Sequence, residues 1–148
     1  MRRLDKRSTC PISYSLDLFG DKWVLLILRD IALAKKHFYK DFLEADEKIA
    51  TNVLSDRLKM LEQQQIIKSR PYEKNKTMKF YFLTEKGIEL IPIIIELWVW
   101  GAKHDVNSAI SQVELQERLL NKSQNIDFYV EQAKTLLSSL EGNSANHS

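Results

Sequence analysis

Cysteine and histidine are scarce in this 148-residue chain, which contains one cysteine, Cys10, and three histidines. A single cysteine cannot close an internal disulfide, and a chain without disulfides suits a reducing compartment. His37, His104 and His147 lie far apart in the sequence and have no cysteine partners. The spacing typical of a zinc or catalytic metal site is absent, so we expect no metal ion and no cofactor.

The chain also lacks a long hydrophobic run. Its most apolar stretch, Ile91–Ala102, is interrupted by Glu96 and is far shorter than the roughly 20 residues that span a bilayer. The basic N-terminus, MRRLDKRSTCP, leads into no uninterrupted apolar segment and no small-residue cleavage site, unlike a secretory signal. We therefore expect a cytoplasmic protein without a membrane segment.

Motifs for catalysis are missing as well. The sequence has no phosphate-binding glycine loop, no nucleophile–base pair and no paired carboxylates at a useful spacing, so we expect no enzymatic activity. Its composition is that of a folded globular protein, with 44% hydrophobic and 28% charged residues.

The net charge of +2 conceals an uneven distribution along the chain. Residues 1–104 contain 19 Lys and Arg against 14 Asp and Glu, whereas residues 105–148 contain 3 against 6. Positive charge gathered in one part of a chain favours contact with nucleic-acid phosphates, although many domains of similar charge bind none. Any nucleic-acid contact is expected in the first 104 residues.

Two helices are predicted near the N-terminus. Pro11–Phe19 begins with proline, which suits the first helical position, and is followed by Gly20, which can end a helix. Asp21 then has the side chain of an N-cap. Lys22–Ala34 is too densely apolar for a surface helix, so we expect it to run through the core.

A helix-turn-helix is predicted next. A short amphipathic helix, Phe38–Ala45, is followed by a polar connection and a longer helix at about Ala50–Gln64. The longer helix has an inward stripe at spacings of three and four, formed by Val53, Leu54, Leu58 and Leu61. Its other faces are small and polar, as in a recognition helix that approaches DNA closely.

Side chains of that longer helix are candidates for reading DNA, because Asn suits adenine and Lys or Arg suits guanine or phosphate. The predicted contacts are Thr51, Asn52, Ser55, Arg57 and Lys59. A solvated helix face is the alternative interpretation. Asp56 and Glu62 could also hold Arg57 in surface ion pairs.

A basic hairpin is predicted after this helix. Ile66–Tyr72 and Met78–Leu83 have the β-branched and aromatic composition of strands, and Glu73–Thr77 joins them as a loop. Such a wing would lie along phosphates or in a minor groove. The predicted contacts from the wing and the segments flanking the motif are Lys35, Lys36, Lys40, Arg70, Lys74, Asn75, Lys76 and Lys79.

The rest of the chain is predicted to be helical. Thr84 can cap a helix running to about His104, with a kink at Pro92. Apolar side chains surround that helix, so we expect a subunit interface formed by Ile91, Ile94, Ile95 and Trp98. Two further helices are predicted at about Ser108–Asn121 and Ile126–Leu140, with a frayed end after Glu141.

These elements together predict a mainly α protein with a small β-hairpin, an α+β winged helix-turn-helix with C-terminal dimerisation helices. Residues 1–104 would form the DNA-binding domain, including an N-terminal arm and the long helix, and residues 105–148 a helical extension. The expected partners are double-stranded DNA and a second copy of the chain. A protein-interaction module that uses the same fold without DNA is the alternative.

The chain resembles the HxlR-type regulators over roughly Cys10–His104. The matching pieces, in order, are Cys10-Pro11, Gly20-Asp21-Lys22-Trp23, His37-Phe38 with Asp41-Phe42, Leu54-Ser55-Asp56-Arg57-Leu58 with Leu61-Glu62, Tyr81-Phe82-Leu83-Thr84 with Gly87, and Trp100-Gly101. The resemblance implies a dimeric repressor or activator without enzymatic activity, binding a pseudo-palindromic operator. The chain departs from the pattern at Gln65, where the family usually has glycine, and in the wing at Asn75–Met78.

Cys10 is a candidate redox or electrophile sensor. It precedes a helix N-terminus, whose dipole favours a thiolate, and Arg2, Arg3, Lys6 and Arg7 are near in sequence. The resemblance implies the same role, because some family members sense oxidants through a cysteine at this position. A half-buried, inert cysteine is the alternative.

The three tryptophans, Trp23, Trp98 and Trp100, could line a pocket for a small-molecule effector. Packing in the core is the alternative and the one we expect, because aromatic side chains supply large buried area whether or not a ligand is present.

Overall fold

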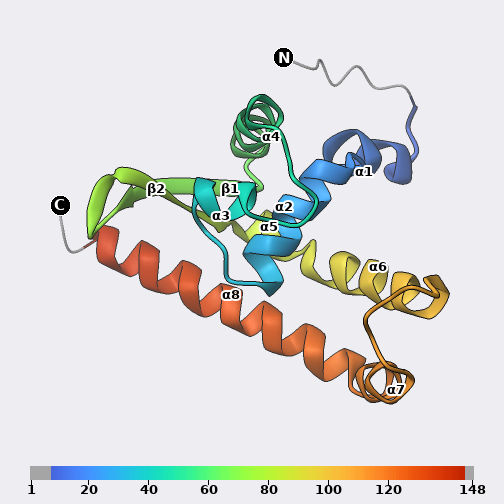
Figure 1. Ribbon diagram of the computed structural model, residues 1–148. Coiled ribbons are helices and arrows are strands. Elements are labelled where there is room, and N and C mark those ends of the chain that lie inside the picture. Colours follow the sequence, from blue (N-terminus) through green and yellow to red (C-terminus); the bar gives the residue numbers. More distant parts are fainter. Residues whose placement is uncertain (1–7, 146–148) are drawn as a thin grey trace. The chain divides into compact units, whose positions relative to one another are not determined.

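The structure is a computed structural model that describes residues 8–145, in a first unit ending at Thr84 and a second beginning at Glu85 (Figure 1). Arg2, Arg3, Lys6 and Arg7, which the sequence places near Cys10, lie outside the described residues, as do residues 146–148 of the predicted frayed end. Packing thus divides the chain at Thr84, whereas the boundary at residue 104 stays a prediction.

Two helices open the first unit, and their ends follow local signals in the sequence. α1 (Pro11–Phe19) has proline in its first turn, and α2 (Lys22–Leu33) is capped by Asp21. Asp21 Oδ1 accepts the amide N–H groups of Trp23 at 2.9 Å and Val24 at 3.2 Å. A Cβ at Gly20 would lie 2.5 Å from the Leu16 carbonyl oxygen, so glycine is needed where α1 ends. Both predicted helices and the Asp21 cap are confirmed.

The helix-turn-helix consists of α3 (Tyr39–Leu43) and α4 (Thr51–Gln63). Leu54, Leu58 and Leu61 of α4 are buried, as predicted, while Val53 is only partly covered. Burying one leucine side chain contributes roughly 1.5–3 kcal/mol, so this stripe anchors α4 on α2 and on the hairpin. Phe42 of α3 and Ile27 and Leu28 of α2 lie in the same core.

The hairpin is an antiparallel pair, β1 (Ile67–Tyr72) and β2 (Asn75–Leu83), with Ile67 opposite Leu83 and Tyr72 opposite Asn75. The predicted loop, Glu73–Thr77, was too long, because the turn contains only Glu73 and Lys74 and β2 already begins at Asn75. Asn75 Oδ1 accepts the amide N–H of Thr77 at 3.2 Å and its hydroxyl at 2.6 Å. These local bonds hold the start of β2, and the register is irregular beside Pro71.

The second unit consists of four helices within the described residues: α5 (Glu85–Ile88), α6 (Ile91–His104), α7 (Gln112–Leu120) and α8 (Lys122–Ala145). The single helix predicted from Thr84 to His104 is broken between α5 and α6. Pro92 lies in the first turn of α6, where its missing N–H costs no intrahelical bond. The predicted kink is therefore a break.

The C-terminal helices differ from prediction in their ends. α7 begins later than predicted, after Ser111, whose hydroxyl accepts the Glu114 amide N–H at 3.1 Å. α8 begins earlier and continues past Leu140 to Ala145, so residues 141–145 of the predicted frayed end are helical. Gly142 lies within this helix. Its low helix propensity costs about 1 kcal/mol relative to alanine, but the helix continues through it.

α6 packs on α7 and α8 through polar and aromatic contacts. Glu96 Oε1 forms an ion pair with Lys122 Nζ at 2.8 Å, and the Arg118 guanidinium lies 4.9 Å from the ring centroid of Trp98. Ile91, Ile94 and Ile95, predicted to face a second subunit, are buried within the chain itself. The apolar side chains that α6 leaves exposed are Ile93, Leu97 and Trp100.

Within residues 8–145, none of the helices combines the length and the apolar character needed to cross a bilayer.

Candidate nucleic-acid interface

The outward face of α4 is small, polar and accessible. Thr51, Asn52, Ser55 and Lys59 are all exposed, above the buried leucines of the same helix. Asn and Ser present hydrogen-bonding groups close to the helix backbone, and Lys59 adds a positive charge. This face has the chemistry needed to read base edges in a major groove.

Tyr39 of α3 orients part of that face. Its hydroxyl donates to the Thr51 carbonyl oxygen at 3.2 Å and lies 3.2 Å from Ser55 Oγ. A tyrosine hydroxyl has one proton, so the Ser55 hydroxyl donates to Tyr39 when Tyr39 donates to Thr51. Tyr39 was missed in the sequence analysis. The only signal was a polar-tipped aromatic in the short helix before the recognition helix.

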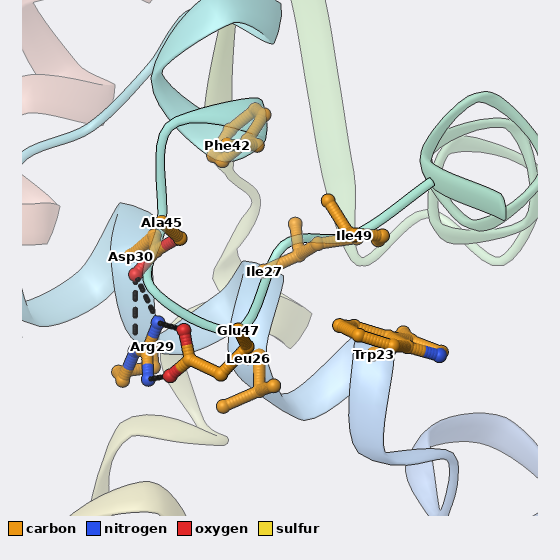
Figure 2. Close-up of a pocket in the computed structure, with 9 residues that line it drawn as sticks. All are labelled: Trp23, Leu26, Ile27, Arg29, Asp30, Phe42, Ala45, Glu47 and Ile49. Carbon is orange, nitrogen blue, oxygen red and sulfur yellow. Dashed lines mark hydrogen bonds and ion pairs between the residues drawn. The ribbon is translucent and has the colours of Figure 1, made fainter. Parts of the chain in front are cut away.

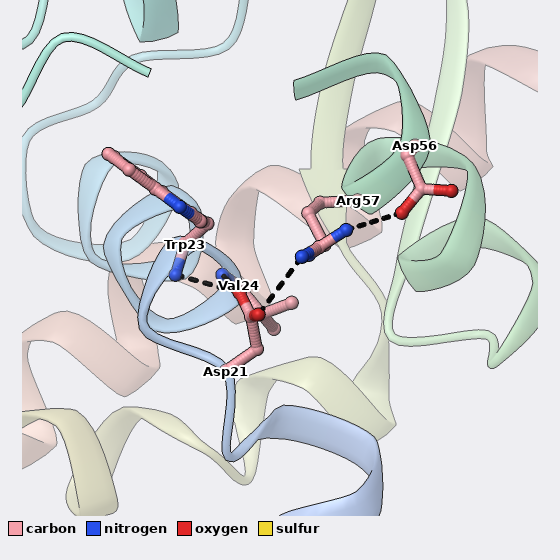
Figure 3. Close-up of polar contacts among 5 residues, drawn as sticks. All are labelled: Asp21, Trp23, Val24, Asp56 and Arg57. Atoms are coloured by element: carbon pink, nitrogen blue, oxygen red, sulfur yellow. Dashed lines mark hydrogen bonds and ion pairs between the residues drawn. The ribbon is translucent and has the colours of Figure 1, made fainter. Parts of the chain in front are cut away.

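Arg57 lies on a different side of α4 and is half-buried. Its Nη2 donates to Asp21 Oδ2 at 3.1 Å and its Nη1 to Asp56 Oδ2 at 2.5 Å (Figure 3). The structure contains the ion pair between Arg57 and Asp56 that the sequence suggested as an alternative to DNA contact. Glu62, the other partner considered, instead accepts the Ser69 hydroxyl at 3.3 Å.

The opposite charges of Arg57 and its two carboxylate partners stabilise each other. Burial raises the pKa of the Asp21 carboxyl, but hydrogen bonds from Arg57 and from the amides of Val24 and Trp23 outweigh it, so the pKa lies below its usual value. The hydrogen bond to Asp21, followed by the one to Asp56, raises the pKa of Arg57. Both groups are ionised at neutral pH.

The side chains around α4 and on the hairpin that were predicted to contact DNA differ in exposure. Those exposed are Lys35, Lys40, Lys74, Asn75, Lys76 and Lys79, and those half-buried are Lys36 and Arg70. Three lysines within six residues lie at and just after the hairpin turn, where phosphate oxygens could reach them. Contact with DNA by each of these residues stays a prediction.

Aromatic rings join the hairpin to the start of α3. The His37 ring stacks on Phe80 with centroids 4.4 Å apart, and Phe38 meets Tyr72 and Phe80 edge to face at 4.9 and 5.6 Å. His37 Nδ1 donates to the Tyr81 carbonyl oxygen at 2.8 Å, and the Tyr81 amide returns a bond of 2.8 Å to the His37 carbonyl oxygen. The wing is thereby held on the helix-turn-helix.

A small, partly open hollow lies between α2, α3 and the loop before α4 (Figure 2). Trp23, Leu26, Ile27, Phe42 and Ile49 give it apolar walls. Arg29 borders it and links α2 to the loop, since its two terminal nitrogens bind the two carboxylate oxygens of Glu47. Of the three tryptophans weighed for an effector pocket, only Trp23 lines this space.

Cys10 is exposed and immediately precedes α1. Hydrogen bonds from the backbone N–H groups of Ser13 and then Ile12 lower the pKa of its thiol. Electropositive backbone groups beside an accessible sulfur favour the reactive thiolate. Elsewhere, no three His, Cys, Asp or Glu residues of the described chain lie close enough together to hold a metal ion.

The sequence pattern of the HxlR-like helix-turn-helix family matches residues 18–109, more than half of the chain. The chain belongs to this family. The resemblance inferred from the ordered motifs is confirmed, and so is the mainly helical winged fold.

Individual relatives agree with the assignment to the HxlR-like family. The HTH-type transcriptional regulator BH0655 of Halalkalibacterium halodurans is 33% identical over 97 residues, which are 66% of this chain and 86% of the relative. The crystal structure of PA1607, a candidate transcription factor, matches with a TM-score of 0.63 and 30% identity over 72% of this chain and 73% of that one. The oxidised form of the redox regulator HypR matches with a TM-score of 0.57 and 27% identity, over 68% of this chain and 100% of that one.

This HxlR-like protein is therefore a transcription regulator with a DNA-binding winged helix-turn-helix fold. Proteins of this kind are regulators rather than enzymes.

Proposed function

We propose that this HxlR-like protein is a homodimeric repressor that binds a pseudo-palindromic operator in the bacterial cytoplasm. The observation that carries the proposal is the exposed polar face of α4, with Thr51, Asn52, Ser55 and Lys59, beside a hairpin that presents Lys74, Lys76 and Lys79. The helix would enter the major groove and the hairpin would contact phosphates. Two-fold symmetry would space the two helices by about 34 Å, one turn of DNA.

Selection of binding sites from a random DNA library, followed by a salt titration on the selected site, tests this function. Asn52→Ala should weaken binding by roughly 5- to 150-fold, because a good side-chain contact to a base contributes about 1–3 kcal/mol. Asn107→Ala, which removes an exposed asparagine from the second unit, is the matched control. Affinity that does not change with salt, or equal affinity of the two variants, would argue against the proposal.

The second subunit would dock on the exposed stripe of α6. Ile93, Leu97 and Trp100 follow each other at spacings of four and three, so they share one side of the helix, and they are 41%, 50% and 68% exposed. Of the residues predicted for the interface, Ile91, Ile94 and Ile95 would support this stripe from within the fold, and Trp98 would lie beside it. α1 exposes a second apolar pair, Ile12 and Leu16.

Repression is the proposed direction of regulation. Transcription in vitro from a promoter that contains the selected site should fall when the protein is added. A rise in transcript would identify an activator instead.

Redox or electrophile sensing through Cys10 is the proposed form of regulation. HypR, a structural relative, is a redox regulator, and Cys10 is accessible and inclined to form a thiolate. Treatment with a thiol oxidant should change the DNA affinity of the native protein but not of Cys10→Ser, by an interchain disulfide or by an adduct. Equal responses of the two proteins would remove Cys10 from the mechanism.

A further inference from the structure

We propose that Arg57 is a positioning residue for DNA binding, which fixes the orientation of α4 through Asp21 and makes no contact with DNA itself. The inference deepens the proposed function and rests on α4 being the helix that reads the operator. It assigns to Arg57 a different role from the neighbouring polar residues of the same helix.

Arg57 projects from a side of α4 away from its exposed polar face. Successive residues of an α-helix are rotated by about 100°, so Arg57 lies roughly 140–160° around the axis from Asn52, Ser55 and Lys59. Its side chain is 27% exposed, beside the buried leucine stripe rather than opposite it. A guanidinium on this side points toward α2 instead of into a groove read by Asn52.

Two carboxylates hold the guanidinium of Arg57 in place. Its two terminal nitrogens donate to two different carboxylates, Asp21 of the α2 cap at 3.1 Å and Asp56 of α4 itself at 2.5 Å. A planar guanidinium engaged by two carboxylates has a defined direction, unlike a lysine ammonium. The net charge offered to a phosphate is also reduced, because two negative groups surround one positive group.

Asp21 is an anchor that cannot move freely. One oxygen of its carboxylate caps α2 by accepting the amides of Trp23 and Val24, and the other accepts Arg57 (Figure 3). The two amide hydrogen bonds fix the Asp21 carboxylate at the start of α2. The ion pair with Arg57 then ties α4 to this fixed carboxylate. The same carboxylate therefore begins one helix and orients another.

The remaining contact between α4 and α2 is largely apolar, and apolar packing has little directional preference. Leu54, Leu58 and Leu61 hold α4 against the core but would tolerate a small rotation of the helix about its axis. Base recognition tolerates only about 0.5 Å or 10–20° of misplacement. The ion pair to Asp21 supplies a directional contact with the start of α2, in addition to the hydrogen bonds that join Tyr39 of α3 to Thr51 and Ser55.

Three variants of the full-length protein test the inference on DNA selected with the wild type. Arg57→Gln removes the guanidinium, Asp21→Asn keeps an oxygen to cap α2 but loses the charged partner, and the double variant combines them. Lys59→Gln is the matched control, because it removes the same charge from the exposed face of α4. The readouts are affinity for selected and scrambled DNA, the slope of affinity with salt, and the melting temperature.

Arg57→Gln and Asp21→Asn should each weaken binding to selected DNA by about tenfold, with binding to scrambled DNA and the salt slope unchanged. The double variant should be no weaker than either single one. Lys59→Gln should lower the salt slope, as expected for a lost phosphate contact.

Two results on DNA would overturn the inference. A salt slope that falls in Arg57→Gln as it does in Lys59→Gln, with Asp21→Asn unaffected, would show that Arg57 contacts a phosphate. A lower melting temperature with wild-type affinity of the folded variants would show a role in stability alone.

Hydrogen exchange separates this inference from the proposed function. Amides of α4 should exchange faster in Arg57→Gln and Asp21→Asn than in the wild type, and at the wild-type rate in Lys59→Gln. If the wild type selects no DNA, the operator proposal fails. Unchanged exchange in both variants would overturn the positioning role whether or not DNA is bound.

Discussion

Gln65 follows α4 with a backbone φ of 59°, in the left-handed region that favours glycine. Its amide donates to the Glu62 carbonyl oxygen and the Ile66 amide to the Leu61 carbonyl oxygen, each at 3.0 Å. This pair of bonds is the Schellman ending of a helix, which usually has glycine at the position of Gln65. The departure from the family pattern therefore places a side chain where the backbone conformation favours glycine.

We expect Gln65→Gly to stabilise the protein by about 1 kcal/mol, because the left-handed conformation costs other residues roughly 1–2 kcal/mol. Urea denaturation measures the difference. Gln63→Gly, two residues earlier and inside α4, is the control and should destabilise by up to about 1 kcal/mol. A loss of stability in Gln65→Gly would show that this residue makes contacts worth more than the strain.

His37 makes the stability of the first unit depend on pH. Burial lowers the pKa of His37 below its ordinary value of about 6.5, and the hydrogen bond to Tyr81 opposes this shift only in part. The unfolded chain thus binds a proton at a pH where folded His37 stays neutral. The contribution of neutral His37 to the free energy of unfolding is fully present above about pH 6.5. It is lost progressively as the pH falls below that value.

Urea denaturation at pH 7.5 and 5.5 tests this expectation. The wild type should lose stability with falling pH by at most about 1.4 kcal/mol per pH unit from this group, and His37→Gln should lose less. The variant should also be less stable than the wild type at pH 7.5, because the stacking on Phe80 is removed. Identical pH dependence in both proteins would contradict the assignment.

At the scale of elements, the hairpin is a rigid support for its lysines. β1 and β2 are joined by a turn of two residues, and His37 bonds to Tyr81 from outside the pair. A lysine on a fixed hairpin loses less conformational freedom on binding than one on a long loop. The short turn found in the structure therefore favours a defined phosphate contact by Lys74 and Lys76.

We expect the double variant Lys74→Ala, Lys76→Ala to reduce the salt slope of DNA binding by up to about 2, since each phosphate contact contributes about 0.9. Fluorescence anisotropy over a range of salt concentrations measures the slope. The double variant Lys103→Ala, Lys134→Ala changes the net charge equally and should keep the wild-type slope. Equal slopes in the two variants would mean that overall charge, not the wing, sets the dependence on salt.

At the scale of the whole molecule, the proposed dimer depends on the exposed apolar stripe of α6, formed by Ile93, Leu97 and Trp100. We expect Leu97→Glu to weaken the dimer at least tenfold, which corresponds to about 1.4 kcal/mol. The reason is that burying the new carboxylate in the interface would remove its hydration without supplying a partner of opposite charge. Sedimentation velocity over a range of protein concentrations measures the dissociation. Val113→Glu, which also replaces an exposed apolar residue, should leave the dimer intact. A wild type that stays monomeric would remove the dimer from the proposal.

The sequence by itself determined those features that depend on neighbours along the chain. Pro11 and Gly20 delimit α1, Asp21 caps α2, and the spacing of Leu54, Leu58 and Leu61 orients α4, because each signal acts within a few residues. The ordered motifs also identified the family. The exposed polar face of α4 followed directly from the helical period.

Tertiary structure alone decided which distant residues meet. Arg57 and Asp21 are 36 residues apart and His37 and Tyr81 are 44 apart, so no local spacing could select either pair. It also decided that Ile91, Ile94 and Ile95 are buried while Leu97 and Trp100 stay exposed. An almost wholly apolar helix carries no period that distinguishes an inner from an outer side, and packing against the rest of the chain makes that choice.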